Sequence, residues 1–147
     1  MSRTGAADTS VLGPDGYGAL KLGMSRSAAL ASGVLSPAKP VASDPAGCTG
    51  HDIVGHATGA DSVGVYVSPT QGVVQIAAAA GWHTPERIGI GASKAQVRAA
   101  YPDLVVNTNG AHASVPGNAR AVYRFNLDPA GKVTVFELAL AHQECTN

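Results

Sequence analysis

Aromatic and charged residues are scarce in this chain of 147 residues. Phe, Trp and Tyr make up 5% of the sequence, and Asp, Glu, Lys and Arg make up 14%. An average domain carries roughly 25% charged residues. The ten basic and ten acidic residues cancel, and no block of one sign stands out to provide the positive field that nucleic acids and anionic membrane surfaces attract. We therefore expect neither nucleic-acid nor membrane-surface binding.

Long hydrophobic runs are also missing. No stretch of about 18 apolar residues occurs, so we expect no transmembrane segment. Residues 1–8 lack the apolar centre of a secretory signal peptide. These observations leave two alternatives: a cytosolic protein, or an exported protein whose signal is absent from this sequence.

The chain has only two cysteines, Cys48 and Cys145, and they do not form a Cys-x-x-Cys pair. Two well-separated cysteines suit a single structural disulfide, which persists in oxidising compartments. Such a bridge would close a loop of about 100 residues, for which chain entropy gives about 4.7 kcal/mol. The alternative is two buried free thiols in a cytosolic protein. We expect the disulfide, and with it a secreted or cell-envelope location.

A repeated motif organises the sequence. Residues 18–28 and 87–97 both contain an apolar alternation, then Gly-x-Ser, then a basic residue that opens an alanine-rich stretch. In each copy the serine, Ser25 or Ser93, is placed to cap a short helix. Gln96 adds a capping-box pattern to the second copy.

Each motif is followed by two runs with strand periodicity joined by a turn that contains proline and glycine. The runs are 63–67 and 73–77 in the first copy, and 122–127 and 133–140 in the second. We expect an α+β fold of tandem helix-plus-β-hairpin repeats, with an antiparallel sheet packed on short helices. Residues 1–13 are predicted to be a flexible leader. Residues 14–147 then form a single domain of two repeats, at about 17–80 and 86–145, with polar loops at 36–60 and 107–118.

The entry Leu22-Gly23-Met24-Ser25, repeated as Ile90-Gly91-Ala92-Ser93 and followed each time by a hairpin, resembles the β-lactamase-inhibitory-protein fold. It is also similar to the SmpA/OmlA (BamE-like) lipoprotein domains. More closely, residues 13–23, 72–74 and 84–102 resemble uncharacterised secreted proteins and lipoproteins of actinobacteria. These resemblances imply export and a non-enzymatic binding role. The chain departs from the inhibitory proteins in its low aromatic content and in having no disulfide within each repeat.

No catalytic or cofactor-binding constellation is evident. The segment from Cys48 to His56 gathers a thiol, two imidazoles and a carboxylate, all potential zinc ligands. However, His51 and His56 are not four residues apart, as two metal ligands on one helical face would be. Gly91-Ala92-Ser93 lacks the remaining residues of a phosphate loop or a nucleophile elbow, so capping explains the serine. We expect no metal, no cofactor and no catalytic residue, although the sequence leaves enzymatic activity open.

The candidate contact residues are Trp82, Tyr66, Tyr123 and Arg124, because Trp, Tyr and Arg dominate interface hot spots. Core packing is the alternative for each of them. The sequence thus predicts a monomeric, exported, non-enzymatic module that recognises another protein, with enzyme inhibition as one form of that role. The second candidate is a small-molecule-binding protein or a cofactor-free enzyme with a pocket between the repeats.

Overall fold

The computed structural model describes residues 10–39, 47–60, 62–108 and 110–146. Eleven elements occur in this part of the chain: β1 (Gly16–Tyr17), β2 (Leu20–Lys21), α1 (Arg26–Ala31), β3 (Thr49–His51), β4 (Val65–Ser68), β5 (Gly72–Ala77), α2 (Lys94–Ala100), β6 (Val105–Asn107), β7 (Gly110–Val115), β8 (Asn118–Leu127) and β9 (Val133–Leu140). The fold is mixed but dominated by strands.

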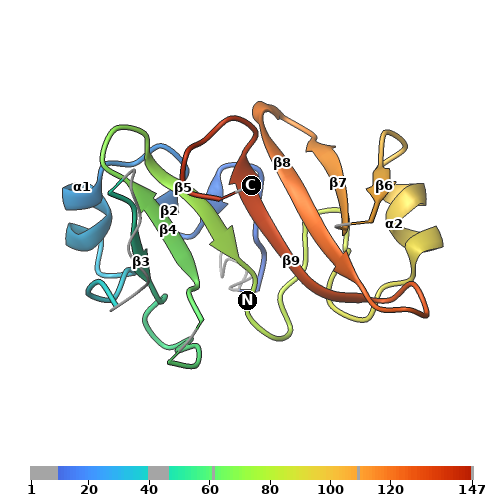
Figure 1. Cartoon of the computed structure of the whole chain (residues 1–147), viewed down its shortest axis with the longest axis horizontal. Coiled ribbons are helices and arrows are strands. Elements are labelled where there is room, and N and C mark those ends of the chain that lie inside the picture. Colours follow the sequence, from blue (N-terminus) through green and yellow to red (C-terminus); the bar gives the residue numbers. More distant parts are fainter. Residues whose placement is uncertain (1–9, 40–46, 61, 109, 147) are drawn as a thin grey trace, which may run out of the picture.

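Seven of the strands form one antiparallel sheet in the order β3-β4-β5-β9-β8-β7-β6, and β1 pairs with β2 separately. The two short helices lie at opposite ends of the sheet (Figure 1). The expectation of an α+β fold with an antiparallel sheet is thus confirmed in outline. The helices contribute less than expected, since the sheet is the main body of the fold.

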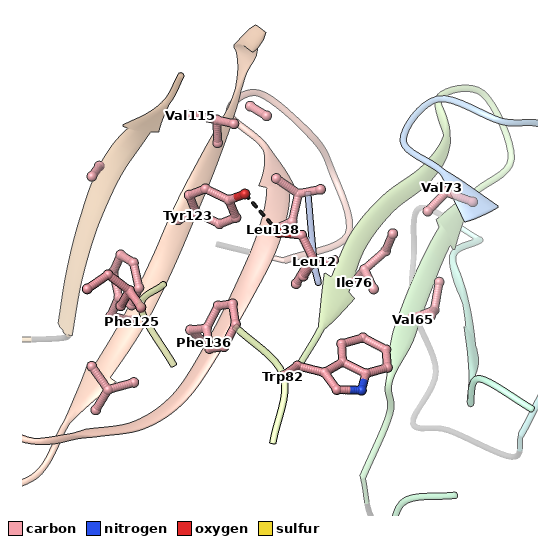
Figure 2. Packing of buried hydrophobic residues seen from close by; sticks show 14 of the residues in the cluster. Leu12, Val65, Val73, Ile76, Trp82, Val115, Tyr123, Phe125, Phe136 and Leu138 are labelled. Carbon is pink, nitrogen blue, oxygen red and sulfur yellow. Dashed lines mark hydrogen bonds between the residues drawn. The ribbon is translucent and has the colours of Figure 1, made fainter. Parts of the chain in front are cut away.

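The core lies on one face of this sheet. Along β8, Tyr123 and Phe125 are buried while Arg124 between them is partly exposed, as strand alternation requires. Phe136 and Leu138 of β9 lie beside them in register, and Ile76 of β5 follows across the sheet (Figure 2). These side chains form one continuous apolar cluster that joins the two halves of the sheet.

The leader predicted at residues 1–13 does not extend through Val11 and Leu12. Val11 forms a parallel bridge with His83, and the Leu12 amide donates to the carbonyl oxygen of His83 at 3.0 Å. The Leu12 side chain is fully buried. Residues 1–9 lie outside the described residues. The leader prediction failed here because one leucine among small polar residues carries no periodic signal.

The polar loop predicted at residues 107–118 is also wrong, because β7 occupies most of it. Ala111, Ala113 and Val115 alternate inward and are buried. Small alanine side chains beside histidine and serine hid this period-two pattern. The loop at 36–60, in contrast, contains only the three-residue strand β3 in its described part.

Both predicted helix caps are confirmed. The Ser25 hydroxyl accepts from the Ala28 amide at 3.2 Å, and the Ser93 hydroxyl accepts from the Gln96 amide at 3.1 Å. The Gln96 side chain completes the capping box by accepting from the Ser93 amide at 2.8 Å. Each cap thereby satisfies amides that the helix itself leaves free.

The segment before each helix is hydrogen-bonded to the last strand of its own half. Gly23 donates to the Val73 carbonyl at 2.8 Å, and Val73 donates back to Met24 at 2.9 Å. In the second half, Gly91 donates to Val133 and Val133 donates to Ala92, both at 2.8 Å. Gly72 is required in the first of these contacts, because a Cβ atom there would collide with the Met24 carbonyl oxygen.

Candidate binding face

The sheet surface opposite the core carries a group of polar and aromatic side chains, which we call the outer face: Tyr66, Gln75, His112, Arg124 and Glu137. Register places them together although each comes from a different strand, so that five strands contribute. Tyr66 lies opposite Gln75, and Arg124 lies between Glu137 and His112. All but Gln75 are partly exposed. The outer face therefore crosses the junction between the two halves of the sheet.

Arg124 is the centre of the outer face. Its Nη2 donates to Gln75 Oε1 at 2.9 Å and to Thr146 Oγ1 at 2.8 Å, and its Nε lies 3.4 Å from Glu137 Oε1. Thr146 in turn donates to Gln75 Oε1 at 2.6 Å. Nη1 has no partner among the described residues. The guanidinium is therefore fixed in place while one of its nitrogens stays available for a further acceptor.

Glu137 lies in a dehydrated environment despite its cationic neighbour. Burial raises the pKa of its carboxyl group, and the Arg124 guanidinium only partly offsets that effect. An ionised carboxylate is thus less favourable at this position than in water. The Arg124–Glu137 pair, with side chains 20% and 24% exposed, is accordingly only partly hydrated.

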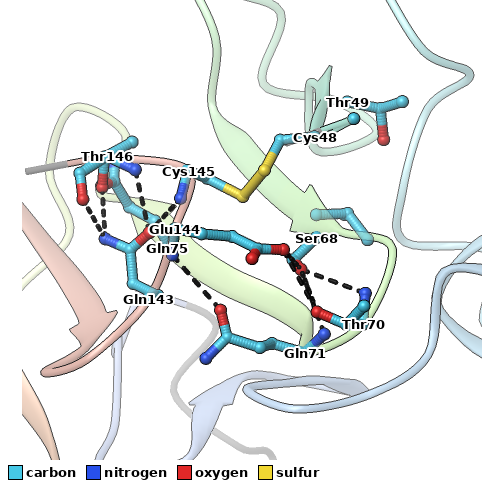
Figure 3. The surroundings of a disulfide bond; sticks show 12 residues. Cys48, Thr49, Ser68, Thr70, Gln71, Gln75, Gln143, Glu144, Cys145 and Thr146 are labelled. Carbon is cyan, nitrogen blue, oxygen red and sulfur yellow. Dashed lines mark hydrogen bonds between the residues drawn. A yellow bond between two sulfur atoms is a disulfide. The ribbon is translucent and has the colours of Figure 1, made fainter. Parts of the chain in front are cut away.

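The C-terminal segment reaches the outer face and is anchored by the disulfide between Cys48 and Cys145 (Figure 3). Glu144 Oε1 accepts from the hydroxyls of Ser68 and Thr70 at 2.7 and 3.1 Å. Gln71 Nε2 donates to the His142 carbonyl at 2.9 Å. The β4–β5 turn, β3 and the C-terminus are thereby tied together, which fixes Thr146 beside Arg124.

Only two of the four predicted contact residues lie on the outer face. Tyr66 and Arg124 are linked through Gln75, which is opposite the first and hydrogen-bonded to the second. Tyr123 is completely buried, and its hydroxyl donates to the Leu12 carbonyl at 2.9 Å. Trp82 is 3% exposed and stacks on Tyr17 with ring centroids 3.8 Å apart. In this conformation the last two are packing residues, the alternative that the sequence left open.

The sequence did not identify Gln75, Glu137 or His112 as part of the site. Gln75 carried a usable signal, because it is a lone polar residue in the apolar run Val73–Ile76. His112 lies in β7, which was not predicted as a strand. Glu137 carries no such signal, since nothing local indicates that Arg124 lies opposite.

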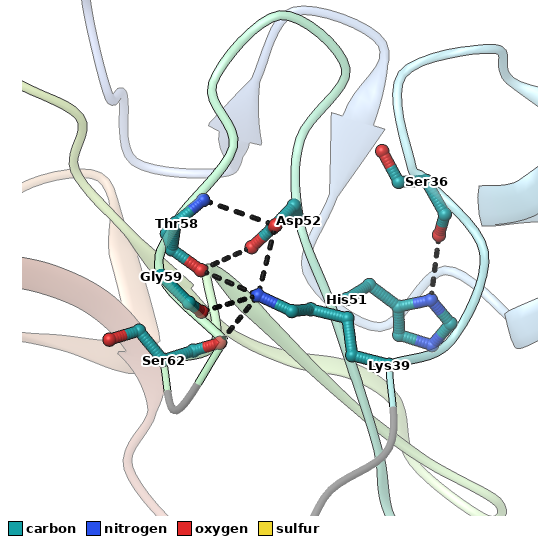
Figure 4. Close-up of polar contacts among 7 residues, drawn as sticks. All are labelled: Ser36, Lys39, His51, Asp52, Thr58, Gly59 and Ser62. Atoms are coloured by element: carbon teal, nitrogen blue, oxygen red, sulfur yellow. Dashed lines mark hydrogen bonds and ion pairs between the residues drawn. The ribbon is translucent and has the colours of Figure 1, made fainter.

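Three of the four potential zinc ligands in the Cys48–His56 segment form other bonds. Cys48 is oxidised in the disulfide. Asp52 accepts from Lys39 and Thr58, and one ring nitrogen of His51 is bonded to the Ser36 carbonyl (Figure 4). The other ring nitrogen of His51 is bonded to the Thr49 hydroxyl. Among residues 10–39, 47–60, 62–108 and 110–146, no three potential ligands gather around a point where a metal could bind.

No protein family, curated protein or solved structure was found to match this chain. Within its described residues, no helix is long and apolar enough to cross a membrane.

Proposed function

We propose that the chain is an exported, non-enzymatic binding module that recognises another protein through the outer face. The observation that carries this proposal is the state of Arg124, whose guanidinium is fixed by neighbouring side chains while Nη1 has no acceptor among the described residues. Tyr66, partly exposed nearby, adds an aromatic contact surface. Arginine and tyrosine are enriched among the residues that dominate binding energy at interfaces, and fixing them beforehand reduces the entropy cost of association.

The disulfide supports export, since such bonds persist mainly in oxidising compartments. A secreted or envelope-attached monomer is the form that we propose.

The proposed tandem repeat is supported by matching details in the two halves. The paired amides of Gly23 and Gly91 bond equivalent valines, Val73 and Val133. In each hairpin the strand pairing shifts register directly after this valine, Val73 in the first half and Val133 in the second. A duplicated unit of this kind agrees with the resemblance to the β-lactamase-inhibitory-protein fold, which implies protein recognition, with enzyme inhibition as one form of it.

The proposal can be tested by capture of partners from an actinobacterial culture filtrate on immobilised protein. Asn126 is exposed beside Arg124 on the same side of β8, so Asn126→Trp would obstruct the outer face without entering the core. Arg98→Trp, at an exposed position of α2, is the matched control. Tyr66→Ala removes one predicted contact.

A specific partner should bind the wild type and Arg98→Trp equally, and should lose at least tenfold in affinity with Asn126→Trp. Tyr66→Ala should weaken it as well, since truncation of a central aromatic costs about 2 kcal/mol or more. Captured proteins that bind the wild type and all three variants alike would count against the outer face, as would the failure of any protein to bind the wild type reproducibly.

A further inference from the structure

Small-molecule binding is the second class of function that the sequence leaves open, and a separate pocket bears on it. A pocket of about 390 Å³ lies where β4 begins and β5 ends. Gly64 and the four alanines Ala77–Ala80 form part of its lining, together with Ile53, Trp82 and the segment His56–Thr58. Its volume falls within the range of roughly 300–1,000 Å³ that is typical of ligand sites.

This end of the first half lacks the bulky residues of the second half. Phe125 pairs with Phe136, and the next pair along is Arg124 with Glu137. In the first half the corresponding pair, Val65 with Ile76, is followed by Gly64 and Ala77, joined by a hydrogen bond of 2.8 Å. A glycine and an alanine thus stand where the second half has an arginine and a glutamate.

The described lining contains no Asp, Glu, Lys or Arg side chain. Its threonine, Thr58, is already committed, since its hydroxyl donates to Asp52 and accepts from Lys39. Neither ring nitrogen of His56 has a hydrogen-bond partner among the described residues, and the same holds for Nε1 of Trp82. The pocket therefore offers an apolar surface with an imidazole and an indole N–H as polar groups.

The aromatic wall is held in place before any ligand binds. Trp82 stacks on Tyr17 at 3.8 Å, and His56 meets the indole edge-on at 5.1 Å. Figure 2 shows the indole extending toward the strands of the first half. A ring fixed by neighbours on the core side loses little freedom when a ligand packs against it.

We propose that this pocket binds a small, uncharged molecule with an apolar body and one hydroxyl or carbonyl group. The alanine and isoleucine surface accommodates the apolar body, and the unpartnered nitrogens of Trp82 and His56 bind the polar group. A carboxylate or ammonium ligand is disfavoured, because the described lining has no opposite charge to offset its desolvation. This proposal does not depend on recognition of a protein at the outer face.

The test is an NMR titration with benzyl alcohol, toluene and benzoate as probes. Trp82 is the single tryptophan of the chain, so its indole N–H gives one resonance that reports on the pocket. Benzyl alcohol should shift that resonance to saturation. Toluene should bind about two- to tenfold more weakly, since it lacks the hydrogen bond. Benzoate should cause no saturable shift.

Two exposed lining positions provide variants that leave the core intact. Ala57→Leu and Ala80→Leu should each weaken benzyl alcohol binding at least tenfold, while Ala119→Leu, at an exposed position on β8, should leave it unchanged. The proposal is overturned if benzyl alcohol fails to shift the Trp82 indole resonance. It is equally overturned if both pocket variants bind benzyl alcohol as the wild type does, or if benzoate binds as tightly as the alcohol.

Discussion

Ala77 of β5 and Glu137 of β9 are register partners near the middle of the large sheet. Ala77 lies four residues after Val73 in β5, as Glu137 lies four residues after Val133 in β9. Two residues along the strands, Gln75 lies opposite Ala139. Under the proposed tandem repeat, in which Val73 matches Val133, Ala77 and Glu137 would be equivalent residues and a local two-fold axis would pass between them.

The disulfide should contribute substantially to stability. The double substitution of Cys48 and Cys145 by alanine should lower the free energy of unfolding by about 2–5 kcal/mol, as is typical when a native bridge is lost. Urea denaturation of both proteins measures the difference. A thiol titration of the unreduced, denatured wild type should find no free thiol, and two reactive thiols would contradict the bridge.

The capping serines should act on stability and not on binding. Ser93→Ala should cost about 0.5–2 kcal/mol, because the Gln96 amide loses its acceptor. Ser25→Ala should cost less, since that cap lacks the reciprocal side-chain bond that Gln96 supplies in α2. Thermal denaturation measures both effects. A binding activity lost in Ser93→Ala without a change in melting temperature would contradict a purely capping role.

Acidification should weaken the Lys39–Asp52 cluster. Burial opposes ionisation of Asp52, but hydrogen bonds from Thr58 and Lys39 prevail and lower the pKa of its carboxyl group below the usual 3.8. A lowered folded-state pKa contributes stability above pH 3.8, and this is lost as pH falls through the folded value. Asp52→Asn should therefore be less stable than the wild type at pH 7. The two should converge below pH 3.8, as chemical denaturation across that range would show.

His51 should make the protein sensitive to a milder pH range. Burial lowers the pKa of its imidazole below 6.5. The hydrogen bond to the Ser36 carbonyl raises this pKa in part, and the charge of nearby Arg26 lowers it further. The unfolded chain then binds a proton that the folded state resists, so stability decreases as pH falls below 6.5. His51→Gln should show a smaller loss between pH 7.5 and 5 in urea denaturation. An unchanged slope would show that another group is responsible.

Glu137 should have the opposite pH signature. Burial raises the pKa of its carboxyl group above the usual 4.5, so its ionisation costs stability as pH rises from 4.5 through the folded value. The stability of Glu137→Gln relative to the wild type should therefore increase over that range. Unfolding free energies measured at pH 4 and pH 7 test this, and a relative stability that decreases with pH would contradict the prediction.

Local sequence signals were sufficient for part of the fold. Ser93 and Gln96 identify their helix start because a cap depends only on residues three positions apart. The strands around Tyr123 and Phe136 are evident because large apolar residues alternate with polar ones. In β7 the inward residues Ala111 and Ala113 are too small to produce the same contrast, so that strand was missed.

The outer face could be predicted only in part, because register is not encoded locally. Strand alternation alone places Tyr123 and Arg124 on opposite faces, so no more than one of them could belong to a single contact surface. Which residue Arg124 meets depends on the pairing of β8 with β9 and on the position of the C-terminal segment. No pattern within any one strand reveals that Gln75 and Thr146 meet there.

The bond between Cys48 and Cys145 closes the chain into a covalent ring that contains every strand of the large sheet, from β3 to β9. The exposed turn at Pro129 and Ala130 lies inside this ring. A protease that cuts such a turn produces a nick without separating fragments, because both ends of the cut chain stay attached through sulfur. Outside a cell that secretes proteases, the protein would therefore remain one covalent molecule after a first cut at this turn.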